Sequence, residues 1–321
     1  MRPNPTLHTF TPDEFKGFLA DRALRLQPLA VESLEFTGNG DKRQVVVNDK
    51  LVADSDGFKN VCKFLDVPST FMRKIPLDLA TTISERLVPT LAESTEIIVD
   101  DSKVVGTKRK EAHYQAALPV FEKVLKEVPK VDNIKVFDLG MTTDASIVCK
   151  EFKITPKVND IVRGGLHFLY SEFMFRKPRI EPYTERLVCL NGMTHQESLF
   201  EFEFVSFDKL LADINGAIAK SLAHLQDKLN PDLKKSTGIK IDGVQAIRRI
   251  FKKQNLGSRL LDKVLAAHLI ENDGTSYGVL QAFTRAANEL KYGDRTRLQN
   301  VAGKELVTIG AAHCPSCYAD L

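Results

Sequence analysis

The chain, 321 residues long, contains no tryptophan and no run of about 18 apolar residues, which a membrane-spanning helix would need. Its first residues, Met1–Phe10, also lack the apolar segment of a secretory signal. Its five cysteines, an odd number in a chain of this length, are typical of a reducing compartment. Together these features predict a soluble protein of the cytoplasm.

Sequence motifs of common enzymes and nucleotide-binding sites are also missing. The chain has neither a Gly-x-x-x-x-Gly-Lys-Ser/Thr phosphate loop nor a Gly-x-Gly-x-x-Gly loop after a strand, and neither His-Glu-x-x-His nor Gly-x-Ser-x-Gly occurs. The acidic pairs have structural explanations: Asp100 and Asp101 fit a hairpin tip, and Glu201 and Glu203 fit a solvated strand face. The sequence therefore favours a non-catalytic protein, although missing motifs do not exclude an enzyme.

The composition is that of a folded protein with nearly balanced charge. Hydrophobic residues make up 43% of the chain and charged residues 27%, which argues against disorder. Lys and Arg number 45 and Asp and Glu number 42, which gives a net charge of +3. So small a net charge says nothing about partners, and only its distribution along the chain is informative.

The N-terminal part of the chain alternates between helices and hairpins. A capping box with proline at the first helical position, Thr11–Glu14, begins the first helix. Hairpins are predicted over 34–47 and 97–105, where β-branched runs flank turn residues. Between the hairpins, one helix is expected from Ser55 and another from Pro76. The residues of the latter helix that we expect to face inward are Leu79, Ile83 and Leu87.

Strands dominate from about residue 134 to residue 206. Ranges 134–139 and 145–154 are rich in residues that favour strands. Further on, three phenylalanines alternate with two glutamates over 200–204. Because neighbouring side chains of a strand point to opposite faces, we expect one face to be aromatic and buried and the other anionic and solvated.

The C-terminal third shows helical periodicity. Apolar residues follow helical spacing over 210–229, and Pro231 is predicted to end that helix. Three more helices are predicted over 244–253, 259–271 and 275–290. The chain is therefore expected to have an α+β fold, with a mixed α/β N-terminal part, a central mainly antiparallel sheet and an all-helical C-terminal third. We expect an α/β and β-sheet domain over 1–205 and a helical region packed on it over 206–321.

One stretch, Arg186-Leu187-Val188-Cys189-Leu190-Asn191-Gly192-Met193, resembles a motif of a phage- and plasmid-borne family known only as domain of unknown function 932. Segments 65–72, 157–166, 171–173 and 277–287 are similar to that family in the same order. Two positions depart from its pattern. Leu190 stands where threonine is common, and Phe173 stands where glycine is typical.

The resemblance implies a phage or mobile-element origin, and hence the cytoplasm of a host cell, but no established chemistry. The residues that match the central motif are Arg186, Cys189, Asn191 and Gly192. Cys189 beside Arg186 could be an activated nucleophile, since a nearby cation favours the thiolate. The favoured interpretation is a small core residue in a buried strand.

A second candidate site lies at the C-terminus. His313, Cys314 and Cys317 have the types and spacing of zinc ligands, but a closed zinc site needs a fourth ligand. No second Cys-x-x-Cys occurs, and the other cysteines and histidines are scattered. We therefore expect a free tail and no cofactor, with zinc as the alternative.

Positive charge is concentrated over 233–263, which holds nine basic and two acidic residues. On a helix, one face of this segment would carry Arg248, Arg249, Lys252 and Lys253. The opposite, packed face would carry Val244, Ile247, Ile250 and Phe251. A basic face backed by a packed face is what phosphate binding requires, although an ordinary solvated helix shows the same pattern. Further basic residues are Lys108, Arg109, Lys110 and Arg176.

These observations predict a non-catalytic accessory protein of a phage or mobile element. We expect it to bind DNA, single-stranded DNA included, during replication or recombination. One alternative is a phage factor that binds a host protein without touching nucleic acid. Another is an enzyme that uses Cys189 or the C-terminal metal ligands. A homo-oligomer is compatible with each of these functions, and no membrane partner is expected.

Overall fold

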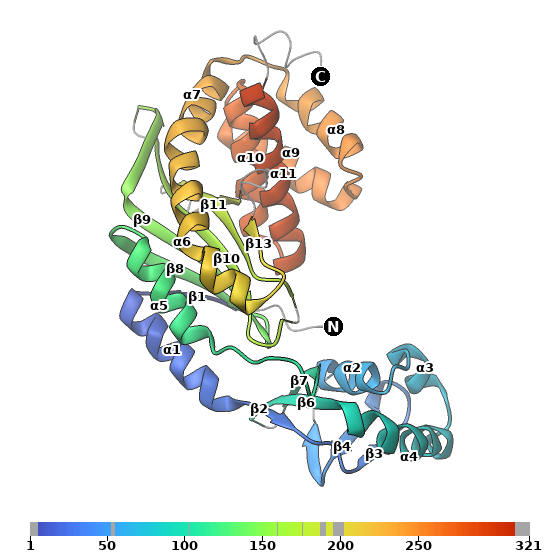
Figure 1. Cartoon of the computed structure of the whole chain (residues 1–321). Coiled ribbons are helices and arrows are strands. Elements are labelled where there is room, and N and C mark those ends of the chain that lie inside the picture. The colour runs from blue at the N-terminus through green and yellow to red at the C-terminus, as the bar shows by residue number, and fades with distance from the viewer. Residues whose placement is uncertain are drawn as a thin grey trace.

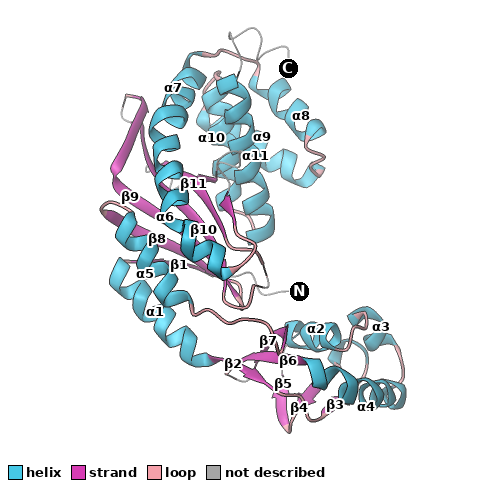
Figure 2. Cartoon of the chain, in the orientation of Figure 1, coloured by secondary structure: helices cyan, strands magenta, loops and turns pink. Residues whose placement is uncertain are grey.

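A computed structural model describes residues 6–52, 55–101, 103–158, 160–174, 176–186, 191–194 and 202–311. Figure 1 shows a central sheet with helices on it, a smaller unit at the lower end and a group of helices at the upper end. The strands belong to the central sheet and to the smaller unit, whereas the upper end is helical (Figure 2).

The central sheet is antiparallel, with strand order β1-β8-β9-β10-β11-β12, and β13 also pairs with β11. Its strands are β1 (Leu7–Phe10), β8 (Val131–Asp138), β9 (Thr142–Lys157), β10 (Asp160–Ser171), β11 (Arg179–Arg186), β12 (Asn191–Thr194) and β13 (Phe202–Glu203). The register of β9 and β10 places His167 opposite Ser146 and Phe168 opposite Ala145. Because side chains alternate, His167 and Phe168 face opposite sides of the sheet.

Three helices cover one face of this sheet: α1 (Pro12–Arg25), α5 (Ala117–Glu127) and α6 (Phe207–His224). The predicted capping box of α1 is confirmed, because the Thr11 backbone N–H donates to Glu14 Oε2 at 2.8 Å and the Glu14 N–H donates to Thr11 Oγ1 at 3.4 Å. Beneath the helices, Phe121 contacts Phe168 with ring centroids 4.9 Å apart. Both rings are fully buried, so this face is an apolar core.

The aromatic strand predicted over 200–204 lies partly in the described chain. Phe204 is buried and Phe202 half-buried, while Glu203 is exposed, which confirms the alternation there. Phe200 and Glu201 lie outside the described residues.

The smaller unit is inserted between α1 and α5, and its described residues form two three-stranded sheets, three α-helices and a short 3-10 helix (Gly40–Lys42). One sheet contains β2 (Leu26–Leu29), β6 (Thr95–Asp100) and β7 (Lys103–Arg109), and the other contains β3 (Leu34–Thr37), β4 (Gln44–Val47) and β5 (Lys50–Val52). The helices are α2 (Ser55–Phe64), α3 (Ser69–Lys74) and α4 (Leu77–Ser94). Both predicted hairpins are confirmed as β3–β4 and β6–β7.

The predicted inward face of α4 is wrong at Leu79, whose side chain is 43% exposed. The fully covered positions of this helix are Ala80, Ser84 and Val88, one residue further along than expected. Ser84 can be buried because its hydroxyl donates to the carbonyls of Leu34 and Thr81. A buried, hydrogen-bonded serine thus takes one inner position, while the predicted Ile83 and Leu87 pack, partly buried, against the same core.

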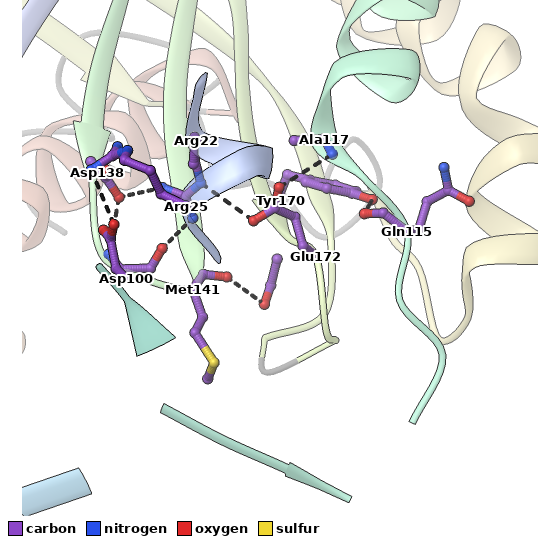
Figure 3. Close-up of polar contacts among 11 residues, drawn as sticks. Arg22, Arg25, Asp100, Gln115, Ala117, Asp138, Met141, Tyr170 and Glu172 are labelled. Carbon is purple, nitrogen blue, oxygen red and sulfur yellow. Dashed lines mark hydrogen bonds and ion pairs between the residues drawn. The ribbon is translucent and has the colours of Figure 1, made fainter. Parts of the chain in front are cut away.

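Polar contacts at the end of α1 link this helix both to the central sheet and to the inserted unit (Figure 3). Arg22, 1% exposed at the end of α1, donates to Glu172 at 3.3 Å, to Asp138 and to the carbonyl of Gly140. Arg25 donates to Asp100 of β6 at 3.0 Å. Burial raises the pKa of Glu172, and the Arg22 guanidinium partly offsets that rise.

The segment 171–173 lies at this same junction. The Ser171 hydroxyl donates to the Met141 carbonyl at 2.9 Å, and the second carboxylate oxygen of Glu172 accepts the Ala117 N–H at the start of α5. Phe173 packs with Leu26 and Ile98 of the inserted unit. Here the segment holds two parts of the chain together.

The C-terminal third begins with a helix that continues further than predicted. The expectation that Pro231 ends it is wrong, since a π-helical turn (Leu225–Leu229) carries α6 into α7 (Asn230–Gly238). Pro231 lies in the first turn of α7, directly after the π-helical turn, so the missing amide donor falls where the hydrogen-bond pattern of the helix changes. The remaining helices are α8 (Gly243–Lys253), α9 (Ser258–Glu271), α10 (Ser276–Asn288) and α11 (Tyr292–Ala311).

The predicted α+β class is confirmed, with an antiparallel sheet and a helical C-terminal part. Helices α7 to α11 form their own apolar cluster, which also includes Ile154 of β9 and Val162 of β10. The division into 1–205 and 206–321 stays a prediction. Within the described ranges, no helix is both long and apolar enough to cross a bilayer.

Candidate functional site

The helix α8 carries the basic residues singled out in the sequence. It begins after Asp242, whose side chain accepts the Gln245 N–H at 3.1 Å, and it ends at Lys253. Its buried positions are Gly243, Ala246, Ile247, Ile250 and Phe251. All four predicted cations, Arg248, Arg249, Lys252 and Lys253, are exposed. At 100° per residue they span an arc of about 140°, which we call the basic arc.

The packed face of α8 differs from the prediction at one residue. Val244 is 39% exposed, whereas Ala246 is buried. Val244 lies at the edge of the apolar stripe in the first turn, and the small Ala246 adjoins the basic arc instead. The cations therefore lie next to a small side chain, where the helix surface is hollowed.

Ala246 lines a groove of about 440 Å³ between α8 and α11. The residues that define its character are Ala246, Arg249, Ile250, Lys252, Lys253 and Glu305. Lys253 Nζ lies 3.7 Å from Oε1 of Glu305, and Glu305 is 4% exposed. The end of α8 is held by Arg297 of α11, which donates to the Asn255 carbonyl at 2.8 Å. The groove thus has two fixed walls.

The other predicted basic residues lie elsewhere. Lys108 of β7 is largely buried, and its Nζ lies 2.6 Å from Glu96. Arg109 and Lys110 are exposed in the inserted unit, at the end of the molecule opposite α8 (Figure 1). Arg176 is exposed before β11. The structure does not bring these residues together with the basic arc.

Of the residues singled out in the motif over 186–193, Arg186, Asn191 and Gly192 lie on two paired strands. Arg186 of β11 is opposite Asn191 of β12, and Glu185 is opposite Gly192. Helices α10 and α11 pack against β12. Cys189, between the two strands, lies outside the described residues, as do His313, Cys314 and Cys317.

The cysteines that the structure describes, Cys62 and Cys149, are buried. Burial raises the pKa of each thiol to about 12, so both stay protonated near neutral pH and are poor nucleophiles. No group of three or more His, Cys, Asp or Glu side chains suited to a metal ion occurs among the residues with defined placement.

A cluster of buried charges, which sequence reasoning missed, lies on the sheet face beneath α11. His167 of β10 is clamped between two carboxylates, with Nε2 2.6 Å from Asp144 Oδ1 and Nδ1 2.8 Å from Glu181 Oε1. The Tyr292 hydroxyl of α11 donates to Asp144. Nearby, Lys135 Nζ lies 2.7 Å from Glu185 Oε2. The three carboxylates and His167 are at most 5% exposed.

The protonation of this cluster limits its chemistry. Burial would lower the pKa of His167, but the charges and hydrogen bonds of Asp144 and Glu181 outweigh it and raise the pKa to about 10. His167 is therefore an imidazolium with both ring N–H groups engaged, and it has no lone pair for a metal or for proton abstraction. The adjoining cavity, about 20 Å³, is the size of one water molecule. The cluster is suited to holding α11 rather than a substrate.

Comparison with protein-family models, with curated proteins and with solved structures finds no match to this chain. The resemblance carried by the motif over 186–193 accordingly stays a prediction.

Proposed function

We propose that the chain is a non-catalytic accessory protein that binds nucleic acid through the basic arc of α8. Its setting would be the cytoplasm of a cell that carries a phage or mobile element, and its ligand DNA undergoing replication or recombination. The observation that supports this proposal is the exposure of all four cations on a helix whose other face is packed. Such cations neutralise phosphates and release counterions.

The ion pairs of the basic arc also support this function. Within the described ranges, Arg248 and Lys252 form no ion pair, so their charge is available to a ligand. Lys253 is near Glu305, but it remains 55% exposed. Contacts from these side chains to phosphates would carry no base sequence information.

Charge reversal tests the proposal most directly. We expect Arg248→Glu with Lys252→Glu to weaken DNA binding uniformly across sequences, because both residues contact phosphates and neither packs in the core. If all four cations neutralise phosphates of a single strand, log affinity falls against log salt with a slope of about −3 in the parent, and less steeply in the variant. Fluorescence anisotropy at several salt concentrations measures both quantities.

A matched control is Lys209→Glu with Lys220→Glu, which makes the same change in net charge at exposed positions of α6. This control should bind DNA as the parent does. Absence of DNA binding by the parent at low salt, or equal binding by parent and α8 variant, would exclude the basic arc. A host protein partner would then be the better explanation.

A further inference from the structure

The groove between α8 and α11 combines three kinds of surface. Its apolar part comes from Ala246 and Ile250. The basic arc contributes Arg249, Lys252 and Lys253, and Glu305 of α11 brings one carboxylate. At about 440 Å³, the groove is within the range of about 300–1,000 Å³ that is usual for small-molecule sites.

The carboxylate of Glu305 is incompletely satisfied. Its Oε1 is buried and accepts no hydrogen bond from the residues described, and the nearest cation, Lys253 Nζ, is 3.7 Å away. A buried acceptor without a donor destabilises the structure that contains it. A ligand that brings an N–H group into the groove would supply the missing donor once the Glu305 side chain turns this oxygen towards the groove that it lines.

We propose that this groove holds one unpaired nucleobase of a bound strand, an inference that rests on the function proposed above. A nucleobase has apolar faces for Ala246 and Ile250, and its edge carries N–H groups for Glu305. Its own phosphate would lie at the basic arc. In a duplex the same N–H groups are paired with the opposite strand, so this site selects single strands.

Binding of an oligothymidylate, of an abasic oligonucleotide of the same length and of a duplex tests the inference. All three keep the phosphates, but only the first offers an unpaired base. We expect the parent to bind oligothymidylate about tenfold more tightly than the abasic strand, which is what one hydrogen bond to a charged group contributes. Equal affinity for these two strands would overturn the inference.

The variant Glu305→Leu separates recognition from repulsion. If Glu305 accepts an N–H from the base, the variant loses affinity for oligothymidylate and binds the abasic strand as the parent does. If Glu305 merely repels phosphates, the variant binds both strands more tightly, and the inference fails. Circular dichroism checks its fold, and Ala246→Leu, which fills the groove without changing charge, gives an independent variant with the same expectation.

The proposed function fails in a different way. If the Arg248→Glu, Lys252→Glu variant binds the abasic strand as well as the parent does, the basic arc does not contact phosphates. If that variant loses the abasic strand while the parent fails to prefer oligothymidylate, phosphate binding stands and the nucleobase site is excluded.

Discussion

His167 and Phe168 are neighbours on β10, yet they lie in opposite environments. Phe168 is packed with Phe121 and Tyr170 under α1, α5 and α6, in an apolar core. His167 lies under α11 between two carboxylates, in a layer of buried charge. Both side chains are almost completely buried, at 4% and 0% exposure. One sheet is thus packed through apolar contacts on one face and through buried charges on the other.

The comparison shows what each kind of contact contributes. Apolar burial is non-directional and tolerates changes of partner, so it stabilises the helices on its face without fixing their position in detail. Buried ion pairs gain little net free energy, but they are very costly when one partner is lost. On the charged face, made of Lys135, Asp144, His167, Glu181 and Glu185, stability depends on a complete set of partners, and the Tyr292 hydroxyl of α11 donates to Asp144 there.

The largest effect is expected from His167→Ala. This change removes the imidazolium between the buried carboxylates of Asp144 and Glu181, which leaves only the more distant Arg179, 3.8 Å from Glu181, and it should lower the free energy of unfolding by about 3–5 kcal/mol. Phe168→Ala, the matched change on the apolar face, should cost a similar amount through the cavity it creates. Urea denaturation measures both.

The two losses should differ in whether they can be rescued. Removing the charges together, as His167→Leu with Asp144→Asn and Glu181→Gln, should restore much of the stability lost in His167→Ala, because no buried charge is then unpaired. If this triple variant is less stable than His167→Ala, the charged face is not stabilised by its ion pairs, and the proposed difference between the two sheet faces is wrong.

The stability of the charged face should depend on pH. The raised pKa of His167, about 10 against an ordinary value of 6.5, means that its contribution is complete below about pH 6.5 and is lost as pH rises through about 10. The lowered pKa of Asp144, caused by His167 and Tyr292 against the opposing effect of burial, adds stability above its ordinary pKa of 3.8. That part is lost as the carboxylate protonates in acid. Urea denaturation from pH 6 to 10 should show that the free energy of unfolding of the parent falls, and that it falls less in the triple variant. Equal falls in the two proteins would contradict the role of His167.

The smallest effect is expected from Tyr292→Phe, which removes one hydroxyl between α11 and the charged face. Its hydrogen bond to the Asp144 carboxylate should contribute about 1.5–3 kcal/mol, as such bonds to charged groups do. Tyr114→Phe is the control, because Tyr114 is 46% exposed and contacts Phe173 through its ring. Thermal denaturation should separate the two variants, and equal melting temperatures would mean that Tyr292 does not anchor α11.

Local patterns made much of the fold predictable. The capping box at Thr11, the two hairpins and the helices α8, α9 and α10 depend on neighbours within a few residues, and sequence periodicity detects these. The continuation of the helix beyond Pro231 could not be predicted, because a π-helical turn and packing on two cores outweigh the usual tendency of proline to end a helix. On α4, tertiary packing buries Ala80, Ser84 and Val88, whereas the apolar spacing pointed to Leu79.

The candidate sites show even more clearly that a sequence pattern reveals local features and not tertiary contacts. The basic arc was predictable because four cations follow helical spacing within one segment. The charged face was not, since Arg179, Glu181, Tyr183 and Glu185 alternate along β11 as a solvated strand face would. Residues of α11, distant in sequence, lie beside Tyr183 of this strand. Likewise, Lys108 looks like a surface cation in the sequence, but Glu96 on the neighbouring strand binds it.

The continuous rod of α6, the π-helical turn and α7 has a consequence for how the molecule opens. Ile214 and Ile218 at one end belong to the core on the sheet, Leu229 and Leu233 at the other end belong to the C-terminal core, and Leu222 between them touches both. Neither core can separate without breaking this rod. The sheet and the C-terminal helices should therefore exchange their amide hydrogens as one cooperative unit, whereas the inserted unit, whose main core contains neither end of the rod, can open on its own.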